Sequence, residues 1–438
     1  MLKKNELIFI SFMLFSMFFG AGNLIFPAFL GSSAGEDVWL SLAGFITTAV
    51  GLPILGVLAV AKAGSFHTLV NRVHPIFAFL FPLLIYVSIG PGLAIPRAGS
   101  IAYEMGMKPF LPETWMNQPV MLAVYTVIFF AVTLWLSLQP SKLVDRFGKL
   151  LTPILLIMIA LIFVKSLITP MGEFTVATGA YQDNSFFQGF MDGYLTMDAL
   201  AALVFGIVVA NTIRSKGVQD TKLVSKYMGF AGLGAGILLA SIYTILGFLG
   251  ASSASLGEAE NGAGVLTIVM NELFGSIGIV LLGLLFTLAC LCVCIGLIIS
   301  CSQYFSTLFP KLSYKKWAVI LAVLSLLVAN LGLNQILSIS VPILGAIYPV
   351  AVVLILLGLV GNSVSHSVYL VATIFTAVFS VIETINTTFL NGMLDDVLGV
   401  IPLYEQGVGW ILPALVGVII GLFMRKTFEQ PDFEEVAA

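Results

Sequence analysis

The sequence Phe18-Phe19-Gly20-Ala21-Gly22-Asn23-Leu24-Ile25-Phe26-Pro27 lies within the first apolar run of the chain, which extends from about Leu7 to Leu30. A run of this length is typical of a transmembrane helix, which needs about 20 apolar residues. Its two glycines and asparagine predict a break in the helix, and such a break survives at membrane depth only where it faces protein or a water-filled cavity. It can present carbonyl oxygens to a cation and N–H groups to a carboxylate. A glycine face for helix packing is the alternative, but the cost of burying Asn23 favours a functional site.

The sixth apolar run, from about Phe187 to Ile213, has the same features. Its segment 189–200 contains two glycines, Thr196 and the acids Asp192 and Asp198. Because an apolar stretch follows Asp198 directly, we expect this acid at membrane depth, where an acid indicates a binding site by default. A protonated acid, or one paired with a helix end, is the alternative. Two interrupted spans, one opening each half of the chain, indicate an inverted-repeat transporter with its site at the membrane midplane.

The composition excludes a soluble globular protein. Of the 438 residues, 59% are hydrophobic and only 9% are charged, whereas soluble domains are about one-quarter charged. A formal net charge of -3 provides no basic field for nucleic acid. Membrane lipid is therefore the main expected partner of this protein.

Twelve apolar runs predict an all-α polytopic membrane protein with twelve transmembrane helices in one transporter domain, residues 1–438. The runs are 7–30, 38–61, 76–103, 120–138, 150–168, 187–213, 227–251, 276–309, 317–333, 336–360, 367–390 and 409–424. We predict one repeat over about 7–168, an inverted second repeat over about 187–360, and two extra helices over about 367–424. A short acidic tail, 427–438, follows.

The distribution of basic residues predicts the orientation. With the N-terminus inside, 16 of the 19 Lys and Arg residues fall in cytoplasmic segments, as the positive-inside rule requires. The exceptions are Arg97, Lys108 and Lys165. Both termini are therefore predicted to be cytoplasmic, and the membrane is expected to be the cell membrane.

Three further segments carry structural predictions. Arg97 follows the helix-breaking stretch Gly90-Pro91-Gly92; it can bind a substrate carboxylate or pair with Glu104 or another acid, and the structural pairing is favoured. Glu383, with the nearby polar residues Asn386, Thr387 and Thr388, is assigned a structural or interfacial role. The external piece Val265–Phe274 is either a short helix over the external mouth or a surface loop.

The chain has no motif for nucleotide hydrolysis, zinc proteolysis or a serine hydrolase nucleophile. Its four cysteines, Cys290, Cys292, Cys294 and Cys301, lie in one apolar run and indicate neither a disulfide framework nor a zinc site. We therefore expect no enzyme activity, no catalytic residues, no metal site and no cofactor. The segment Gly232–Gly236 favours helix packing over a dinucleotide turn.

The residues around the first break resemble the motif of a known protein family. The segment Phe15-Ser16-Met17-Phe18-Phe19-Gly20-Ala21-Gly22-Asn23-Leu24-Ile25-Phe26-Pro27 resembles the signature of the bacterial branched-chain amino acid:cation symporters. Gly90-Pro91 through Ala94-Ile95-Pro96-Arg97 and Gly193-Tyr194-Leu195-Thr196-Met197-Asp198-Ala199-Leu200 resemble further motifs of that family. The resemblance implies the fold of the bacterial leucine transporter, with five-plus-five inverted repeats, and uptake of leucine, isoleucine and valine driven by sodium, a co-transported ion rather than a cofactor.

The residue types at the two breaks suit an amino acid zwitterion, which needs polar groups for both charges and an apolar pocket for its side chain. The candidate substrate-binding residues are Phe19, Gly20, Ala21, Gly22, Asn23, Ile95, Gly193, Tyr194, Thr196 and Met197. The candidate ion-binding residues are Ala21, Asn23, Thr196, Asp198 and Thr287. By the resemblance, Cys292-Val293 stands where a threonine pair is common, which puts one sodium site in doubt.

Three rival functions remain open at this stage. A proton-coupled amino acid carrier of the same fold is the nearest, because a desolvated acid can titrate. An ion channel fits less well, since two broken helices suit a closed central site better than a continuous pore. A receptor or scaffold would normally carry a sizeable soluble domain.

Overall fold

A computed structural model describes residues 2–116, 118–361 and 364–424. In these ranges every regular element is a helix and no strand occurs, so the prediction of an all-helical chain is confirmed for them. The predicted tail 427–438 and the predicted cytoplasmic residues Arg425 and Lys426 lie outside the described residues.

All of the first six predicted runs are helical, and four of them, the first, second, third and sixth, are interrupted or distorted. The elements are α1 (Lys4–Phe18), α2 (Ala21–Ala34), α3 (Val38–Ile46), α4 (Leu52–Ala63), α5 (Phe66–Asn71), α6 (Pro75–Val87), α7 (Ala94–Gly106), α8 (Glu113–Met116), α9 (Pro119–Ser137), α10 (Thr152–Ile168), α11 (Tyr181–Tyr194) and α12 (Asp198–Ser215). Wider π-helical turns join α3 to α4 and α6 to α7, over Thr47–Gly51 and Ser88–Gly92. The first and sixth runs are each divided into two helices, as predicted from their glycines.

The last six predicted runs are also helical. The elements are α13 (Thr221–Ser253), α14 (Gly262–Phe274), α15 (Ser276–Leu308), α16 (Tyr314–Ala329), α17 (Leu333–Val360), α18 (His366–Phe389), α19 (Asp395–Leu398) and α20 (Ile411–Phe423). Of the two alternatives for the piece Val265–Phe274, the short helix is confirmed as α14. Its N-cap, Asn261, accepts hydrogen bonds from the N–H groups of Ala263 and Gly264.

Nine helical stretches of the described chain are long and apolar enough to cross a membrane. The number differs from twelve because α2, α3 and α4 form one continuous stretch, while α1, α16 and α20 have 15, 16 and 13 residues. The full count of twelve spans stays a prediction.

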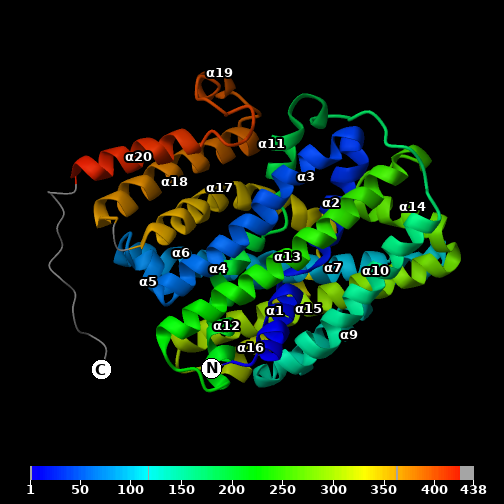
Figure 1. Cartoon of the computed structure of the whole chain (residues 1–438), viewed down its shortest axis with the longest axis horizontal. Coiled ribbons are helices and arrows are strands. Elements are labelled where there is room, and N and C mark those ends of the chain that lie inside the picture. The colour runs from blue at the N-terminus through cyan, green and yellow to red at the C-terminus, as the bar shows by residue number, and fades with distance from the viewer. Residues whose placement is uncertain (1, 117, 362–363, 425–438) are drawn as a thin grey trace.

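Close backbone contacts hold the broken spans against their neighbours. A β-carbon on Gly31 of α2 would lie 2.0 Å from the Gly247 carbonyl oxygen of α13, and one on Gly44 of α3 would lie 2.0 Å from the Phe186 carbonyl oxygen of α11. Only glycine permits these approaches. Figure 1 shows α13 running diagonally beside α4 and α2 through the middle of the molecule. Glycines at 234 and 236 of α13 pack directly against Ser11 and Ile54, which confirms the helix-packing interpretation.

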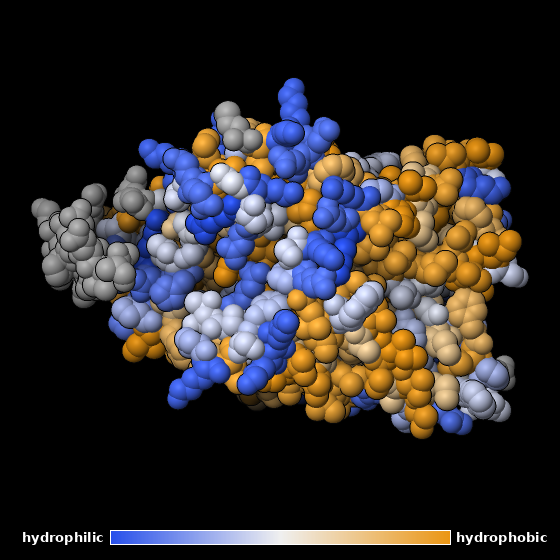
Figure 2. Space-filling view, turned by 90° about the horizontal axis from the view of Figure 1, so that it is seen from below, coloured by the Kyte–Doolittle hydropathy of each residue, from blue (hydrophilic) through white to orange (hydrophobic). Residues whose placement is uncertain are grey.

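Large apolar side chains cover much of the surface. Trp135, Ile168 and Phe423 are 67%, 73% and 84% exposed. Figure 2 shows a mostly apolar surface over the right-hand part of one face and a gathering of hydrophilic residues towards its left and centre. An apolar surface of this extent requires lipid as its solvent. The buried apolar residues beneath it form one continuous core.

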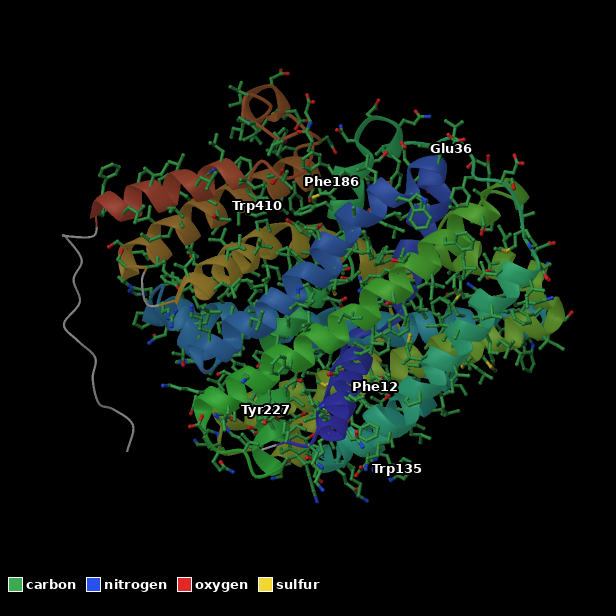
Figure 3. All side chains as sticks on the ribbon, in the orientation of Figure 1. Phe12, Glu36, Trp135, Phe186, Tyr227 and Trp410 are labelled. Atoms are coloured by element: carbon green, nitrogen blue, oxygen red, sulfur yellow. The ribbon has the colours of Figure 1, made fainter. Side chains whose placement is uncertain are left out.

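Two labelled side chains mark opposite ends of the molecule. In Figure 3, Glu36 lies at the end where α2 meets α3, and Tyr227 lies near the other end, in the first turns of α13.

Between α18 and α20, Asn386 donates hydrogen bonds to Asp395 (2.7 Å) and Tyr404 (3.1 Å). Asn386 thus has the structural role that was predicted for its polar patch.

Candidate functional site

The first break consists of two residues in extended conformation, Phe19 and Gly20. The α1 helix ends where the Phe19 N–H donates to the Phe15 carbonyl oxygen (2.8 Å). The α2 helix begins at Ala21, and the Asn23 side-chain oxygen accepts a hydrogen bond from the Gly20 N–H (2.9 Å). Asn23 therefore caps the helix from within its own first turn, and the N-terminal N–H groups of α2 face the break.

The second break contains three residues, Leu195 to Met197, between α11 and α12. Met197 has φ 65° and ψ 10°, in the left-handed region that non-glycine residues rarely adopt. The Thr196 hydroxyl donates to the Gly193 carbonyl oxygen (2.9 Å) and accepts from the Asp198 N–H (3.4 Å). Met197 is 2% exposed, so strained backbone is buried at this point, which is typical of functional sites.

A side-chain network joins the two breaks. The Asn23 amide donates to the Asp198 carboxylate (2.6 Å) and to the Tyr243 hydroxyl of α13 (2.5 Å). The Tyr243 hydroxyl in turn donates to the same Asp198 oxygen (3.1 Å). Asn23 and Asp198 are each 2% exposed and Tyr243 is fully buried. A carboxylate in such a place is stabilised only by donors of this kind or by a cation.

Arg97 of α7 supports the second break from outside. Two of its guanidinium nitrogens donate to the Leu195 carbonyl oxygen, at 3.2 Å each. A β-carbon on Gly22 would lie 3.4 Å from the Arg97 Nη2 atom, so the guanidinium also lies beside the first turn of α2. The predicted pairing with Glu104 is wrong: Glu104 binds Lys108 at 2.7 Å, because Lys108 is one helical turn away, whereas Arg97 is two turns away.

The breaks enclose a cavity with about 430 Å³ of space not filled by protein atoms, including its open mouth. Its polar lining includes Asn23, Arg97, Thr196 and Asp198. The rest of the lining is apolar or small side chains and glycine: Met17, Phe18, Gly20, Ala21, Gly22, Ile89, Ala94, Ala98, Met197, Ala201, Val293 and Leu297. Polar groups therefore converge at the breaks while apolar side chains cover the other walls, as in sites for small amphipathic molecules.

Seven of the residues predicted for substrate or ion binding line this cavity together: Gly20, Ala21, Gly22, Asn23, Thr196, Met197 and Asp198. Five others are not part of the lining: Phe19, Ile95, Gly193, Tyr194 and Thr287. Each of the five packs elsewhere, for a separate reason.

The ring of Phe19 stacks on Phe15 with centroids 5.0 Å apart, and the ring of Tyr194 stacks on Tyr348 at 4.1 Å. A β-carbon on Gly193 would lie 1.8 Å from the Thr48 Oγ1 atom, so Gly193 permits close packing of α11 rather than facing the cavity. Sequence alone does not predict these directions, because an irregular turn has no fixed periodicity.

Ile95 and Thr287 also lie outside the lining. The Ile95 carbonyl oxygen accepts a contact from the Cys294 Sγ atom (3.7 Å), and the neighbouring Ala94 takes its place in the lining. The Thr287 hydroxyl lies 3.2 Å from the Tyr125 hydroxyl of α9. Two residues of α15, Val293 and Leu297, do line the cavity, and Thr287 lies six residues before the first of them, nearly two helical turns away.

Val293 is the residue of α15 that faces the first break. A β-carbon on Gly20 would lie 3.0 Å from the Val293 Cγ1 atom. A hydrocarbon therefore stands at this wall of the cavity, and a hydroxyl would be needed there to coordinate a hard cation. The Ser300 hydroxyl, further along the same helix, donates to the Gly296 carbonyl oxygen (2.8 Å).

Sequence reasoning missed Tyr243, which bonds to both Asn23 and Asp198. The signal is a tyrosine in the middle of the long apolar run 227–251, since a phenol needs a hydrogen-bond partner when it is buried. That signal indicates a partner but does not identify it.

Comparisons with known proteins agree with this architecture. Residues 3–428 match a sequence model of the family described as branched-chain amino acid transport protein. The chain is 46% identical to branched-chain amino acid permease BraB of Bacillus subtilis over 426 residues, covering 96% of this chain and 95% of that one. It is 40% identical to the branched-chain amino acid transport system 2 carrier protein of Pseudomonas aeruginosa, with 98% of each chain covered. It is 37% identical to permease BrnQ of Escherichia coli, with 97% of each covered.

Two solved structures share the fold. The Mhp1 transporter of the nucleobase-cation-symport-1 family, in a closed conformation with bromovinylhydantoin bound, has a TM-score of 0.57 and 14% identity, covering 97% of this chain and 93% of Mhp1. MhsT in complex with L-phenylalanine has a TM-score of 0.58 and 16% identity, covering 94% of this chain and 98% of MhsT. At these identities the likeness concerns the fold alone. The chain is a multi-pass membrane protein of this fold.

Proposed function

We propose that this chain, which belongs to the branched-chain amino acid transport protein family, is a secondary active symporter that imports leucine, isoleucine and valine with sodium. The observation that carries the proposal is the cavity between the two breaks, where Asn23 and Asp198 come from different spans and meet. Alternating access then exposes this cavity first to one side of the membrane and then to the other.

The helix ends around the cavity suit the two charges of an amino acid. The N-termini of α2 and α12 carry partial positive charge, which favours the substrate carboxylate. The carbonyl groups at the C-terminal ends of α1 and α11 carry partial negative charge and favour the ammonium group. In this proposal, Gly20, Ala21, Gly22 and Thr196 contact the charged end of the substrate.

Apolar lining residues then accept the substrate side chain. Met17, Phe18, Ile89 and Met197 line the cavity and have no polar side-chain atom that needs a partner there. A pocket of this kind distinguishes side chains that differ by one methylene by only about 1–3 kcal/mol. Leucine, isoleucine and valine should therefore compete for one site.

The cation is proposed to bind near Ala21, Asn23, Thr196 and Asp198. Asp198 supplies a charge and Thr196 supplies a hydroxyl oxygen close to it. The Asn23 amide presents its NH2 group to Asp198 and its oxygen to the Gly20 N–H, so this amide would turn over to bring its oxygen to the cation. Because binding organises both breaks at once, the ion raises the affinity for the amino acid, and the amino acid raises the affinity for the ion equally. A role for Thr287 in the ion site stays a prediction.

A proton-coupled carrier is the second candidate, and one observation favours it. The Asp198 carboxylate has two hydrogen-bond donors on one oxygen and no cationic side chain within ion-pair distance in the described part of the chain. Protonation is an alternative way to satisfy a buried acid.

The experiment that separates these candidates is uptake of labelled leucine into proteoliposomes of the purified chain. An inward sodium gradient, a proton gradient or neither is imposed, and unlabelled isoleucine, valine and alanine are tested as competitors. Uptake above equilibrium with sodium alone, competed by isoleucine and valine but weakly by alanine, is the expected result. Uptake driven by the proton gradient alone would leave the proposed substrate site unchanged and would mean that the co-transported ion is a proton. No leucine flux under any gradient, with folded protein, would overturn the proposal.

The inverted five-plus-five repeat and the orientation belong to the same proposal. The two broken spans open the two predicted repeats, and 16 of 19 basic residues fall in the predicted cytoplasmic segments. A reporter protein fused after Lys426 should give a cytoplasmic signal. An external signal would reverse the orientation.

A further inference from the structure

A second cavity lies on the membrane-facing surface, apart from the site at the breaks. It is formed by α10, the end of α14 and the first half of α15, and it has about 670 Å³ of space not filled by protein atoms. Seven of its eight lining residues are apolar, among them Ile162, Ile168, Phe274 and Leu281. We call it the α10 groove. Figure 1 shows α10 and α14 close together at the right of the molecule.

The eighth lining residue is a cation, Lys165. Its Nζ atom donates to the hydroxyl of Thr169 (3.0 Å), which carries no charge. In the described residues no carboxylate lies within ion-pair distance of Lys165. Lys165 lies in the last turn of α10, at the depth where a lysine stem covers apolar surface and its ammonium reaches the lipid head groups.

Lys165 differs in this respect from the other two basic residues predicted away from the cytoplasm. Arg97 donates to the Leu195 carbonyl at the first cavity, and Lys108 pairs with Glu104. Lys165 therefore combines an uncompensated positive charge with an adjoining apolar groove. An anionic amphiphile complements both features.

We propose that the α10 groove binds one anionic phospholipid, with an acyl chain along the apolar wall and the phosphate on Lys165. The surroundings support a lipid over a protein partner: Leu161 and Ile168, which flank Lys165 on α10, are 61% and 73% exposed on the apolar surface. In the orientation proposed above, the lipid belongs to the outer leaflet.

This position connects the lipid to the transport site. The α14 helix forms one end of the groove and also packs against α2, the helix that begins at the first break. A lipid in the groove contacts α10, α14 and α15 simultaneously and so stabilises the position of α14 over α2.

Native mass spectrometry of the full delipidated chain tests the proposal, using dioleoylphosphatidylglycerol and dioleoylphosphatidylcholine as probes with identical acyl chains. We expect the anionic lipid to be retained about fivefold more strongly, as one lysine near a phosphate allows. Lys165→Gln should remove this preference and Lys165→Arg should keep it. Lys108→Gln is the matched control and should keep it as well. Leu281→Trp, which fills the groove, should lower the binding of both lipids.

Four results would overturn the proposal. The first is equal retention of the two lipids by the unmodified chain, which needs no variant and no assumption about folding. The second is an unchanged preference in Lys165→Gln. The third is competition by glycerol phosphate at the same concentration as the lipid, because it would mean that Lys165 binds an anion without the groove. A dimer that excludes both lipids would assign the groove to a second copy of the chain.

Discussion

The two breaks at the centre of the molecule are built differently. The break between α1 and α2 needs no strained residue, and its cap, Asn23, belongs to the helix that it caps. The break between α11 and α12 contains Met197 in the left-handed region, and its Leu195 carbonyl is held by Arg97 from another span. The first break is therefore encoded locally, whereas the second depends on a neighbouring helix.

This difference suggests that the two breaks have different roles in the proposed alternating access. A locally capped break keeps its geometry while the surrounding helices move, so it suits a fixed binding platform. A break held by a distant side chain can change when that contact is lost, so α11 and α12 are the better candidates for the moving part. The two breaks meet at Asp198. Variants at this residue and its neighbours are therefore expected to distinguish the contributions of the two breaks most clearly.

The largest effect is expected for Asp198→Asn. The amide removes the charge and places a donor opposite the Asn23 amide, so cation-stimulated leucine uptake should fall by about 100-fold or more. Uptake into proteoliposomes under a sodium gradient measures it. Asp192→Asn is the control from the same span, because Asp192 bonds to Tyr181 and Gln188 in its own helix. Equal losses in both variants would remove the special role of Asp198.

Arg97→Gln should have the next largest effect, since it leaves the Leu195 carbonyl without its charged donor. An unsatisfied buried acceptor costs about 1–3 kcal/mol, which predicts roughly a 5- to 150-fold lower uptake rate. Arg97→Lys should recover part of it, and Lys108→Gln on the same span should behave like the unmodified chain. If the glutamine variant transports normally, the second break does not need its external support.

Tyr243→Phe removes one hydroxyl that bonds to both Asn23 and Asp198. A net contribution of about 1 kcal/mol for each of these two hydrogen bonds predicts a roughly 30-fold weaker apparent sodium affinity, with little change in maximal rate. Sodium titration of the initial uptake rate tests this. Tyr227→Phe, in the same helix near the surface, is the control and should leave the titration unchanged.

Met197→Val tests the strain at the second break. A β-branched side chain is poorly accommodated at positive φ, so this variant should be less stable than Met191→Val, placed in the regular part of α11, by about 1 kcal/mol. Thermal unfolding in detergent compares the two. Equal stability would mean that Met197 does not hold this conformation in the membrane.

The smallest effect is expected for Thr287→Val. Its hydroxyl bonds to Tyr125 and does not line the cavity, so leucine uptake should keep its sodium dependence. A loss of sodium dependence would return Thr287 to the ion site and would require α15 to shift by about two turns or to bind a second ion.

Much of the fold follows from patterns along the chain. All twelve apolar runs are helical in the described residues, and glycines together with polar residues located both breaks, because these signals depend on local hydrogen bonding and on the thickness of the membrane. The orientation stays a prediction from the basic residues. Asn23 and Asp198 were predicted to belong to one ion site, but the hydrogen bond between them was not predicted.

The partners of the central residues could not be predicted in the same way. Asn23 and Asp198 are 175 residues apart, and Tyr243 reaches both from a third helix. Tyr194 and Ile95 resembled lining residues in the sequence, yet the Tyr194 ring stacks on Tyr348 and Ile95 is buried outside the lining. At an irregular turn the direction of a side chain is set by packing, which periodicity does not describe.

The sequence by itself determined a polytopic helical protein with two broken spans and an acid at the second break, because lipid imposes strict rules on length, polarity and backbone hydrogen bonding. Only the tertiary structure decided which groups meet there: that Arg97 supports Leu195 rather than Glu104, and that Val293 rather than Thr287 faces the first break. Those choices depend on how helices rotate and pack against one another, and every helix in contact contributes to them.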